Sequence, residues 1–226
     1  MTHRSAPPQL TRQVEDTLLA SFDGAEDQPS PFRHWVLRQV FPTSLAHELR
    51  TLPWTPPELG GVSGKRELHN DQRHYFAGPA NARFPACAAV AQAFQSARVV
   101  AKIEAATGAD LGGSYVRLEY AQDTDGFWLE PHTDLGVKRF TMLIYLAQGD
   151  GDEDLGTDLF HGPGRWAKRS SFDDNSALVF VPADNTWHGL ARRAIPGVRR
   201  SVIMNYVTDE WRARDQLAFP ETPVRS

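Results

Sequence analysis

Residues 114–147 read SYVRLEYAQDTDGFWLEPHTDLGVKRFTMLIYLA, and turn residues separate the strand-like runs in this stretch. The runs are rich in Val, Tyr, Phe, Thr and Ile, and residues of this kind favour β-strands. Further strand-like segments follow at 158–160, 177–181 and 198–207. The second half of the chain therefore predicts a β unit of about eight short strands.

Helix-like sequence precedes this β unit. Apolar residues recur at helical spacing from Phe84 to Ile103, and Gly108 then offers a C-terminal stop, which predicts one long helix. An earlier amphipathic stretch, Leu10 to Phe22, leads into an acidic, proline-bearing linker. We interpret residues 1–30 as a peripheral N-terminal extension and residues 31–226 as a single domain. Helices followed by many short strands predict a mainly β domain with supporting helices, a jelly roll or barrel whose core spans about 113–208.

The charge and composition of the chain argue against several classes of protein. Lys and Arg number 24 against 28 Asp and Glu, a formal net charge of −4, whereas nucleic-acid binders usually show a basic surplus. No apolar run approaches the ~18 residues of a membrane span, and the N-terminus has no hydrophobic signal region, so we expect a cytoplasmic protein with no membrane partner. The single cysteine, Cys87, is too few for a cysteine-based zinc site, so any metal must be held by His, Asp or Glu. No pattern bears on the oligomeric state.

One group of residues has the composition of a metal site. His132 and Asp134 lie two residues apart, so on an extended chain their side chains point the same way. Such a pair is a common coincidence by itself. His188, however, follows a strand and a turn, and an antiparallel sheet could bring it back beside His132. Two histidines and one carboxylate on one face of a metal form the facial triad of non-haem Fe(II) oxygenases.

A candidate carboxylate anchor follows in the last strand-like run, 198–207. A planar guanidinium can bind a carboxylate through two parallel hydrogen bonds, as the distal end of a dicarboxylate such as 2-oxoglutarate would require. Alternation along a strand sends Arg199 and Ser201 to one face and Arg200 to the other. Only one of the two arginines can therefore be the anchor, and the match to Gly197-x-Arg199-x-Ser201 described below implies that it is Arg199 rather than Arg200.

Six pieces of the chain, in order, carry a resemblance to a known family. They are Val116–Tyr120, the His132/Asp134 pair, Arg139–Leu146 (similar to a T-x-x-x-Y-L strand), Gly156–Phe160 (similar to G-x-T-x-F), Ala177–Phe180 with His188, and Gly197-x-Arg199-x-Ser201. From about Tyr115 to Tyr206 the chain resembles the iron(II) and 2-oxoglutarate dependent dioxygenases, most of all the branch that contains prolyl 4-hydroxylases. Where this family has a double glycine the chain has Leu155-Gly156, and the loop from Tyr120 to His132 is longer. These departures leave the triad intact but argue against a prolyl substrate.

The resemblance implies a fold, a reaction and a set of site residues. The fold is a double-stranded β-helix, that is, a jelly roll. The reaction is an oxidation, most simply a hydroxylation, with Fe(II) and 2-oxoglutarate as cofactors, dioxygen as cosubstrate, ascorbate as an optional reductant, and release of succinate and CO2. The implied residues are the iron ligands His132, Asp134 and His188, and, around the distal carboxylate of 2-oxoglutarate, Arg199, Tyr145, Ser201 and Tyr120.

Two other functions stay open as alternatives. A nucleic-acid demethylase of the AlkB type uses the same triad, but that group carries a second arginine six residues past the first, where this chain has Asn205. The acidic balance also disfavours it. A metal-free or degenerate jelly-roll binding protein belongs to a different class, and the complete triad together with Arg199 argues against it.

The segment from Lys65 to Phe76 suggests residues for the primary substrate. If it forms a strand, Arg73 and Tyr75 share one face. At the mouth of a barrel, Arg73 could pair with an anionic group while Tyr75 packs on the body of the substrate. This favours a small acidic or phosphorylated molecule over a peptide. The alternative interpretation is a solvated loop that leads into an edge strand.

Overall fold

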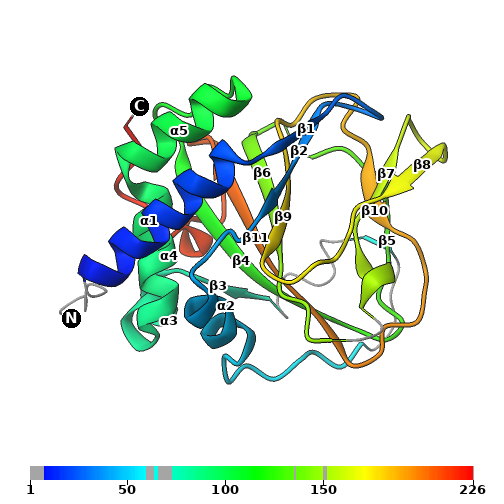
Figure 1. Ribbon diagram of the computed structural model, residues 1–226, viewed down its shortest axis with the longest axis horizontal. Helices are drawn as coiled ribbons and strands as arrows, with labels where there is room; N and C mark the ends of the chain where they lie inside the picture. Colours follow the sequence, from blue (N-terminus) through cyan, green and yellow to red (C-terminus); the bar gives the residue numbers. More distant parts are fainter. Residues whose placement is uncertain (1–7, 60–63, 66–72, 135, 150–151, 226) are drawn as a thin grey trace.

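Two antiparallel sheets form the centre of the computed structural model, which describes residues 8–59, 64–65, 73–134, 136–149 and 152–225 (Figure 1). The larger sheet contains, in spatial order, β1 (Glu26–Gln28), β2 (His34–Arg38), β9 (Ser176–Phe180), β6 (Lys138–Tyr145), β11 (Val198–Val207), β4 (Tyr115–Thr124) and β3 (His74–Tyr75). The smaller sheet contains β5 (Leu129–His132), β10 (His188–Leu190), β7 (Asp158–Phe160) and β8 (Trp166–Arg169). The predicted mainly β jelly-roll architecture is confirmed.

The helices lie on the side of the larger sheet that faces away from the smaller one (Figure 1). They are α1 (Pro8–Asp23), α2 (Thr43–Arg50), α3 (Gly78–Arg83), α4 (Pro85–Gln95) and α5 (Ala97–Thr107). The single long helix expected from the sequence is two helices, α4 and α5, because the backbone at Ser96 is extended. The Ser96 hydroxyl accepts a hydrogen bond from the Val99 amide and so caps α5. Gly108 ends α5 in the left-handed conformation, as predicted.

The described part of the N-terminal segment, residues 8–30, belongs to the core rather than to a peripheral extension. Helix α1 packs against α4 and α5, and its Val14 and Leu18 are fully buried. Strand β1 then pairs with β2 and so extends the larger sheet. An amphipathic helix must bury its apolar stripe, and the helical layer offers the surface for this. No helix among the described residues is both long enough and apolar enough to span a bilayer.

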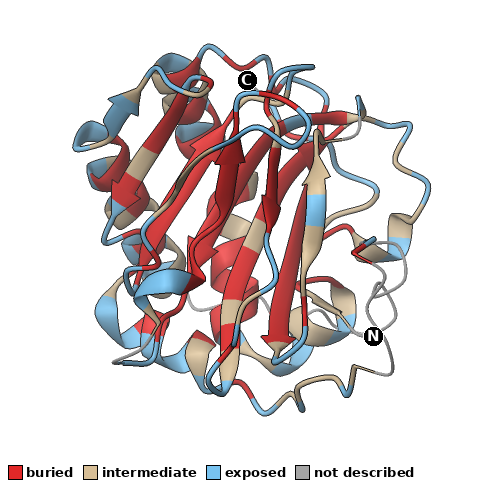
Figure 2. Cartoon of the chain, turned by 90° about the vertical axis from the view of Figure 1, so that its right-hand side faces the viewer, coloured by how far each residue is buried: buried red, intermediate tan, exposed pale blue. Residues whose placement is uncertain are grey.

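The two faces of the larger sheet have opposite character. In β4 the even-numbered residues, such as Leu118 and Tyr120, face the helices and join the main apolar core. The odd-numbered Arg117, Glu119 and Asp123 share the opposite, inner face, which looks toward the smaller sheet, and they too are buried. Figure 2 shows that the strands are buried along most of their length. The inner face therefore places charged groups inside the barrel, where only paired charges are tolerated.

Candidate active site

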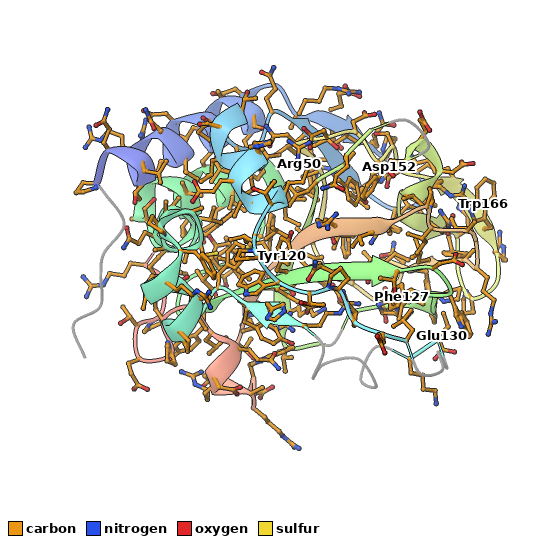
Figure 3. All side chains as sticks on the ribbon, turned by 90° about the horizontal axis from the view of Figure 1, so that it is seen from below. Arg50, Tyr120, Phe127, Glu130, Asp152 and Trp166 are labelled. Atoms are coloured by element: carbon orange, nitrogen blue, oxygen red, sulfur yellow. The ribbon has the colours of Figure 1, made fainter. Side chains whose placement is uncertain are left out.

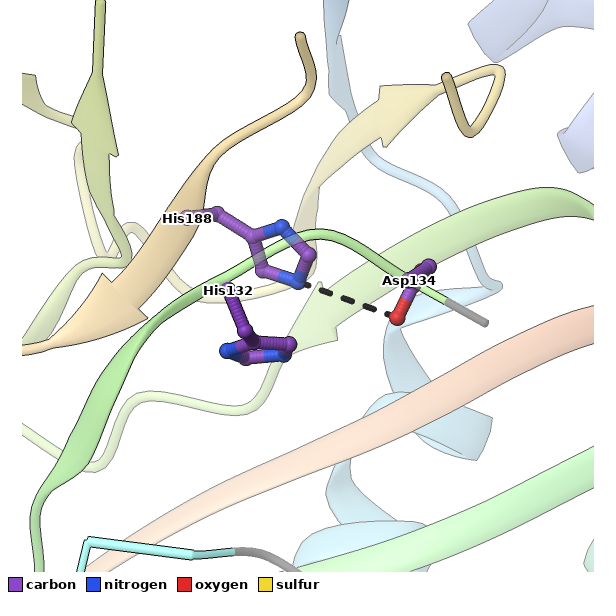
Figure 4. Close-up of side chains that lie close together, drawn as sticks. All are labelled: His132, Asp134 and His188. Atoms are coloured by element: carbon purple, nitrogen blue, oxygen red, sulfur yellow. Dashed lines mark ion pairs between the residues drawn. The ribbon is translucent and has the colours of Figure 1, made fainter. Parts of the chain in front are cut away.

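Three side chains from two segments meet inside the barrel (Figure 4). His132, at the end of β5, lies opposite His188, at the start of β10, and their ring centroids are 4.4 Å apart. Asp134, in the loop after β5, has its Oδ1 3.9 Å from Nε2 of His188. One ligand atom from each of the three residues lies within 4.8 Å of the others. The antiparallel pairing thus brings together the residues that the sequence singled out.

A glycine allows this close pairing. A Cβ atom at Gly189, between His188 and Leu190, would lie 2.8 Å from the Leu129 carbonyl oxygen of β5. Real Cβ atoms essentially never approach so closely, so a larger residue would push β10 away from β5. The distance between the two histidines therefore depends on Gly189.

Both histidines are held in the tautomer that metals bind. Nδ1 of His132 lies 2.9 Å from the Glu130 carbonyl oxygen, and Nδ1 of His188 lies 2.9 Å from that of Thr186. A carbonyl oxygen can only accept, so each Nδ1 carries the proton and each Nε2 keeps its lone pair. Burial lowers the pKa of His188 to about 4, so this imidazole is neutral at physiological pH.

Asp134 is held as a buried carboxylate. Its side chain is 2% exposed; Lys138 Nζ donates to Oδ1 and Thr141 Oγ1 donates to Oδ2, each at 2.5 Å. Burial works to raise the pKa of Asp134, but the charge of Lys138, helped by His188 and the hydrogen bonds, holds it well below its usual range. Asn205 Nδ2 in turn donates to Thr141 Oγ1 at 2.9 Å.

This donor set fits a metal ion. Two neutral imidazole nitrogens and one ionised carboxylate are the ligands of a facial triad, and imidazole and carboxylate suit Fe(II). The sequence did not single out Lys138 or Thr141 as supports of Asp134. The signal of Lys138 is its place at the start of the strand that follows the metal-ligand pair, and Thr141 is the threonine of the T-x-x-x-Y-L match.

Arg199 and Ser201 share one face of β11, as alternation along the strand indicates, and this is the inner face. They border a cavity of about 50 Å³ that is also lined by His188 and Thr157. The Arg199 side chain is buried: Nε donates to the Leu155 carbonyl oxygen at 2.6 Å, and Nη1 lies 2.7 Å from Oδ2 of Asp123. This cavity is the place where the anchor could reach a ligand carboxylate.

The two tyrosines expected around this pocket lie in different places. The Tyr145 ring lies 5.8 Å from the Arg199 guanidinium, but its hydroxyl donates to Thr157 Oγ1 at 2.7 Å. Tyr120 lies on the helix side of β4, where its hydroxyl donates to the Leu49 carbonyl oxygen at 3.0 Å, and burial raises its pKa to about 12. In Figure 3, Tyr120 lies toward the helices, away from Phe127. The structure therefore does not bring Tyr120 to the pocket, because the even-numbered residues of β4 face the helices and not the inside of the barrel.

Arg73 and Tyr75 share a face, but Arg73 is buried instead of bordering the mouth. Its side chain is 6% exposed, with Nη2 2.8 Å from Oδ1 of Asp123 and Nε 3.6 Å from Oε1 of Glu119. The Tyr75 hydroxyl lies 3.3 Å from Arg117 Nη2 and accepts from it. Such burial does not fit a solvated loop at position 73; residues 66–72 of this segment lie outside the described part of the chain.

Asp123 is not among the site residues predicted from the sequence. The pattern that could have indicated it is the set of charged residues at odd positions of β4, which lie on one face of the strand. Asp123 touches both Arg199 and Arg73, so it links the expected anchor to the expected substrate residue.

A larger cavity adjoins the candidate metal ligands. Its volume is about 450 Å³, and its lining includes His132 and Asp134 on one side and Trp211 and Arg212 on another. Arg117, from the inner face of β4, also lines it. Cavities of this size accept small molecules or single side chains.

Comparison with known proteins shows the fold. No family model and no curated protein matches the chain. Among solved structures, a prolyl-4-hydroxylase from Pseudomonas putida matches with 18% identity over 92% of this chain and 99% of the other, at a TM-score of 0.52. Prolyl 4-hydroxylases from Phytophthora capsici give 14% identity, 94% and 70% coverage and a TM-score of 0.58.

A third similar structure is HygX from Streptomyces hygroscopicus with nickel and 2-oxoglutarate bound, with 17% identity, 92% and 94% coverage and a TM-score of 0.50. At these identities the likeness concerns the fold, and it agrees with the two facing antiparallel sheets described above. The chain has the jelly-roll fold of the prolyl 4-hydroxylase-like 2-oxoglutarate oxygenases.

Proposed function

We propose that this chain is an Fe(II)- and 2-oxoglutarate-dependent oxygenase. The observation that carries the proposal is the convergence of His132, Asp134 and His188 on the wall of a barrel that also contains Arg199, with the Nδ1 atom of each histidine facing a backbone carbonyl oxygen. HygX, which has this fold, is described with nickel and 2-oxoglutarate bound, which supports the same cofactors here. When bound, iron and 2-oxoglutarate would supply the oxidising chemistry that turns dioxygen, 2-oxoglutarate and a C–H bond into succinate, CO2 and a hydroxyl group.

The residues of this chain have distinct tasks in the proposed reaction. His132, His188 and Asp134 hold the metal from one side, while Lys138 and Thr141 fix the carboxylate. The guanidinium of Arg199 receives the distal carboxylate of 2-oxoglutarate, and Ser201 lines the same cavity. The apolar cluster of the inner face keeps water from the reacting atoms; it includes Phe127, Leu143, Leu159 and Phe180.

The primary substrate in this proposal is a small molecule. The cavity of about 450 Å³ beside His132 and Asp134 supports this class, because its volume suits one small ligand. Trp211 and Arg212 would meet the substrate there. Since prolyl 4-hydroxylases share the fold, a peptide side chain is the alternative occupant.

The metal and the cosubstrate can be tested directly. Protein purified without oxygen should carry or take up one Fe(II) and convert 2-oxoglutarate to succinate. His132→Ala, Asp134→Ala and His188→Ala should each lower metal uptake and turnover at least ~100-fold, with circular dichroism unchanged, because open catalytic metal sites serve reactivity more than folding. Arg98→Ala, on the exposed face of α5, is the control.

Two results would contradict the proposal. Full turnover in all three ligand variants would remove the site assignment. Wild-type protein that takes up no metal would favour the metal-free binding barrel. For the substrate, mass spectrometry of metabolite and peptide pools should reveal a product that gains one oxygen atom only when 2-oxoglutarate is supplied.

A further inference from the structure

Five buried side chains form a row of alternating charges across the inner face of the larger sheet. In order they are Arg199, Asp123, Arg73, Glu119 and Arg117. The successive nitrogen–oxygen distances are 2.7, 2.8, 3.6 and 2.7 Å. None of the five side chains is more than 8% exposed. This row of charges therefore lies in a buried region where each charge needs a partner.

The positive and negative charges in this row do not balance. Three guanidinium groups face two carboxylates, so within this row of described residues one positive charge has no counter-charge. The nearby Lys138 does not alter the count, because it pairs with Asp134. A buried excess charge is unfavourable, so this end of the barrel is prepared for an anion.

The position of the excess charge is marked by an unpaired donor. Nη1 of Arg73 is buried and makes no hydrogen bond to any residue that the structure describes. Arg73 and Arg199 both line the cavity of about 50 Å³ that also borders Ser201 and His188. Buried N–H groups are rarely left unpaired in proteins, so this one indicates an acceptor supplied by a ligand.

We propose that Arg73 is a second anchor for the distal carboxylate of the cosubstrate. Arg199 would bind this carboxylate from β11 and Arg73 from the segment before β3, while Asp123, hydrogen-bonded to Arg199 and ion-paired with Arg73, holds the two guanidinium groups in place. The added carboxylate would bring the number of acidic groups to three, equal to the number of arginines in the row. This inference rests on the proposed function, and it assigns Arg73 to the cosubstrate rather than to the primary substrate.

Calorimetry with two probes tests the assignment. Nickel-loaded wild type and Arg73→Ala are titrated with 2-oxoglutarate and with 2-oxopentanoate, the same 2-oxo acid with a methyl group in place of the distal carboxylate. Removing a buried charged partner should weaken 2-oxoglutarate binding at least ~30-fold and change 2-oxopentanoate binding less than ~3-fold. Arg98→Ala, an exposed arginine of α5, should bind both probes like the wild type.

The second probe separates an anchor from a structural support. Unchanged 2-oxoglutarate binding by Arg73→Ala, or equal weakening for both probes, would overturn the assignment. If Arg73→Ala does not fold, Arg73→Lys decides the question: it keeps the charge but not the fork of donors, so it should weaken only 2-oxoglutarate. If wild-type protein takes up no nickel and binds neither probe, the proposed function fails and the assignment fails with it.

Discussion

The ammonium group of Lys138 lies 2.5 Å from Oδ1 of Asp134, the same oxygen that lies 3.9 Å from Nε2 of His188. The Lys138 and Asp134 side chains are 6% and 2% exposed. A buried lysine therefore neutralises a candidate metal ligand from within the chain. The arrangement lets the carboxylate remain ionised in the barrel before any ion binds.

Replacing Lys138 should separate folding from metal binding. Lys138→Met keeps the length of the side chain but leaves Asp134 buried without its cation, so the metal-free protein should lose about 3 kcal/mol of unfolding free energy. Nickel should then raise the melting temperature more in the variant than in wild type, because the ion replaces the missing charge. Lys102→Met, which breaks an exposed pair with Asp23, should change neither value. An equal or smaller nickel shift in Lys138→Met would contradict this account.

The stability of the metal-free protein should fall as the pH falls from 6.5 to 4. The pKa of His188 is about 4 in the folded chain and 6.5 in the unfolded chain, so in this window the unfolded chain binds more protons. His188 alone should remove roughly 2 to 3 kcal/mol of unfolding free energy between pH 7 and pH 4.5. Urea unfolding at the two pH values measures this.

A matched variant isolates the His188 contribution. His34 and His74 also have lowered pKa values, mainly through burial, and change stability in the same direction. His188→Asn keeps a donor for the Thr186 carbonyl oxygen but does not titrate. The unfolding free energy of this variant should therefore change less with pH than that of the wild type, by the amount attributed to His188. Identical pH dependence in the two proteins would show that His188 titrates normally.

Arg199 and Arg200 should differ sharply in their effect on 2-oxoglutarate binding. Arg199 borders the inner cavity, whereas Arg200 lies on the side of β11 near Tyr120. Arg199→Ala should weaken binding by ~3 to 5 kcal/mol and Arg200→Ala by under ~1 kcal/mol. Calorimetry on nickel-loaded protein compares the two variants directly. A larger loss in Arg200→Ala would assign the anchor to the outer face.

Gly189 should be essential for the geometry of the metal site. In Gly189→Ala the new Cβ meets the Leu129 carbonyl oxygen, so β10 must move away from β5 and take His188 with it. We expect nickel affinity to fall about tenfold or more, together with a stability loss of about 1 to 3 kcal/mol. Gly78→Ala meets nothing within 4 Å and is the control. Wild-type nickel affinity in Gly189→Ala would show that the two strands adapt without moving the histidines.

The strands and the triad could be predicted because both depend on local sequence patterns: two-residue alternation along a strand and the turns between strands. Alternation along 198–207 places Arg199 and Arg200 on opposite faces, whatever else the protein contains. The pairing of His132 with His188 needs only an antiparallel return of the chain. The break at Ser96 could not be predicted in this way, because apolar residues continue at helical spacing through it.

The faces of β4 were harder to assign. Alternation shows which residues share a face but not which face turns inward. Tyr120 shares its face with apolar Leu118, whereas Asp123 shares its face with Arg117. Apolar side chains on one face predict contact with the helices, but charged side chains on the other can mean either solvent or a buried network. The long-range contacts of Arg73 and Arg199 with the acids of β4 decide between these environments.

The alternating charges from Arg199 to Arg117 also limit how the sequence can change over evolutionary time. Each interior member touches two neighbours, and losing one acid alone would raise the buried excess of positive charge. Substitutions that remove an acid together with an adjacent base leave the net charge of the network unchanged and should survive more often. Among homologues, positions 73, 119 and 123 should therefore vary as a set, with arginine lost from 73 wherever an acid is lost from 119 or 123.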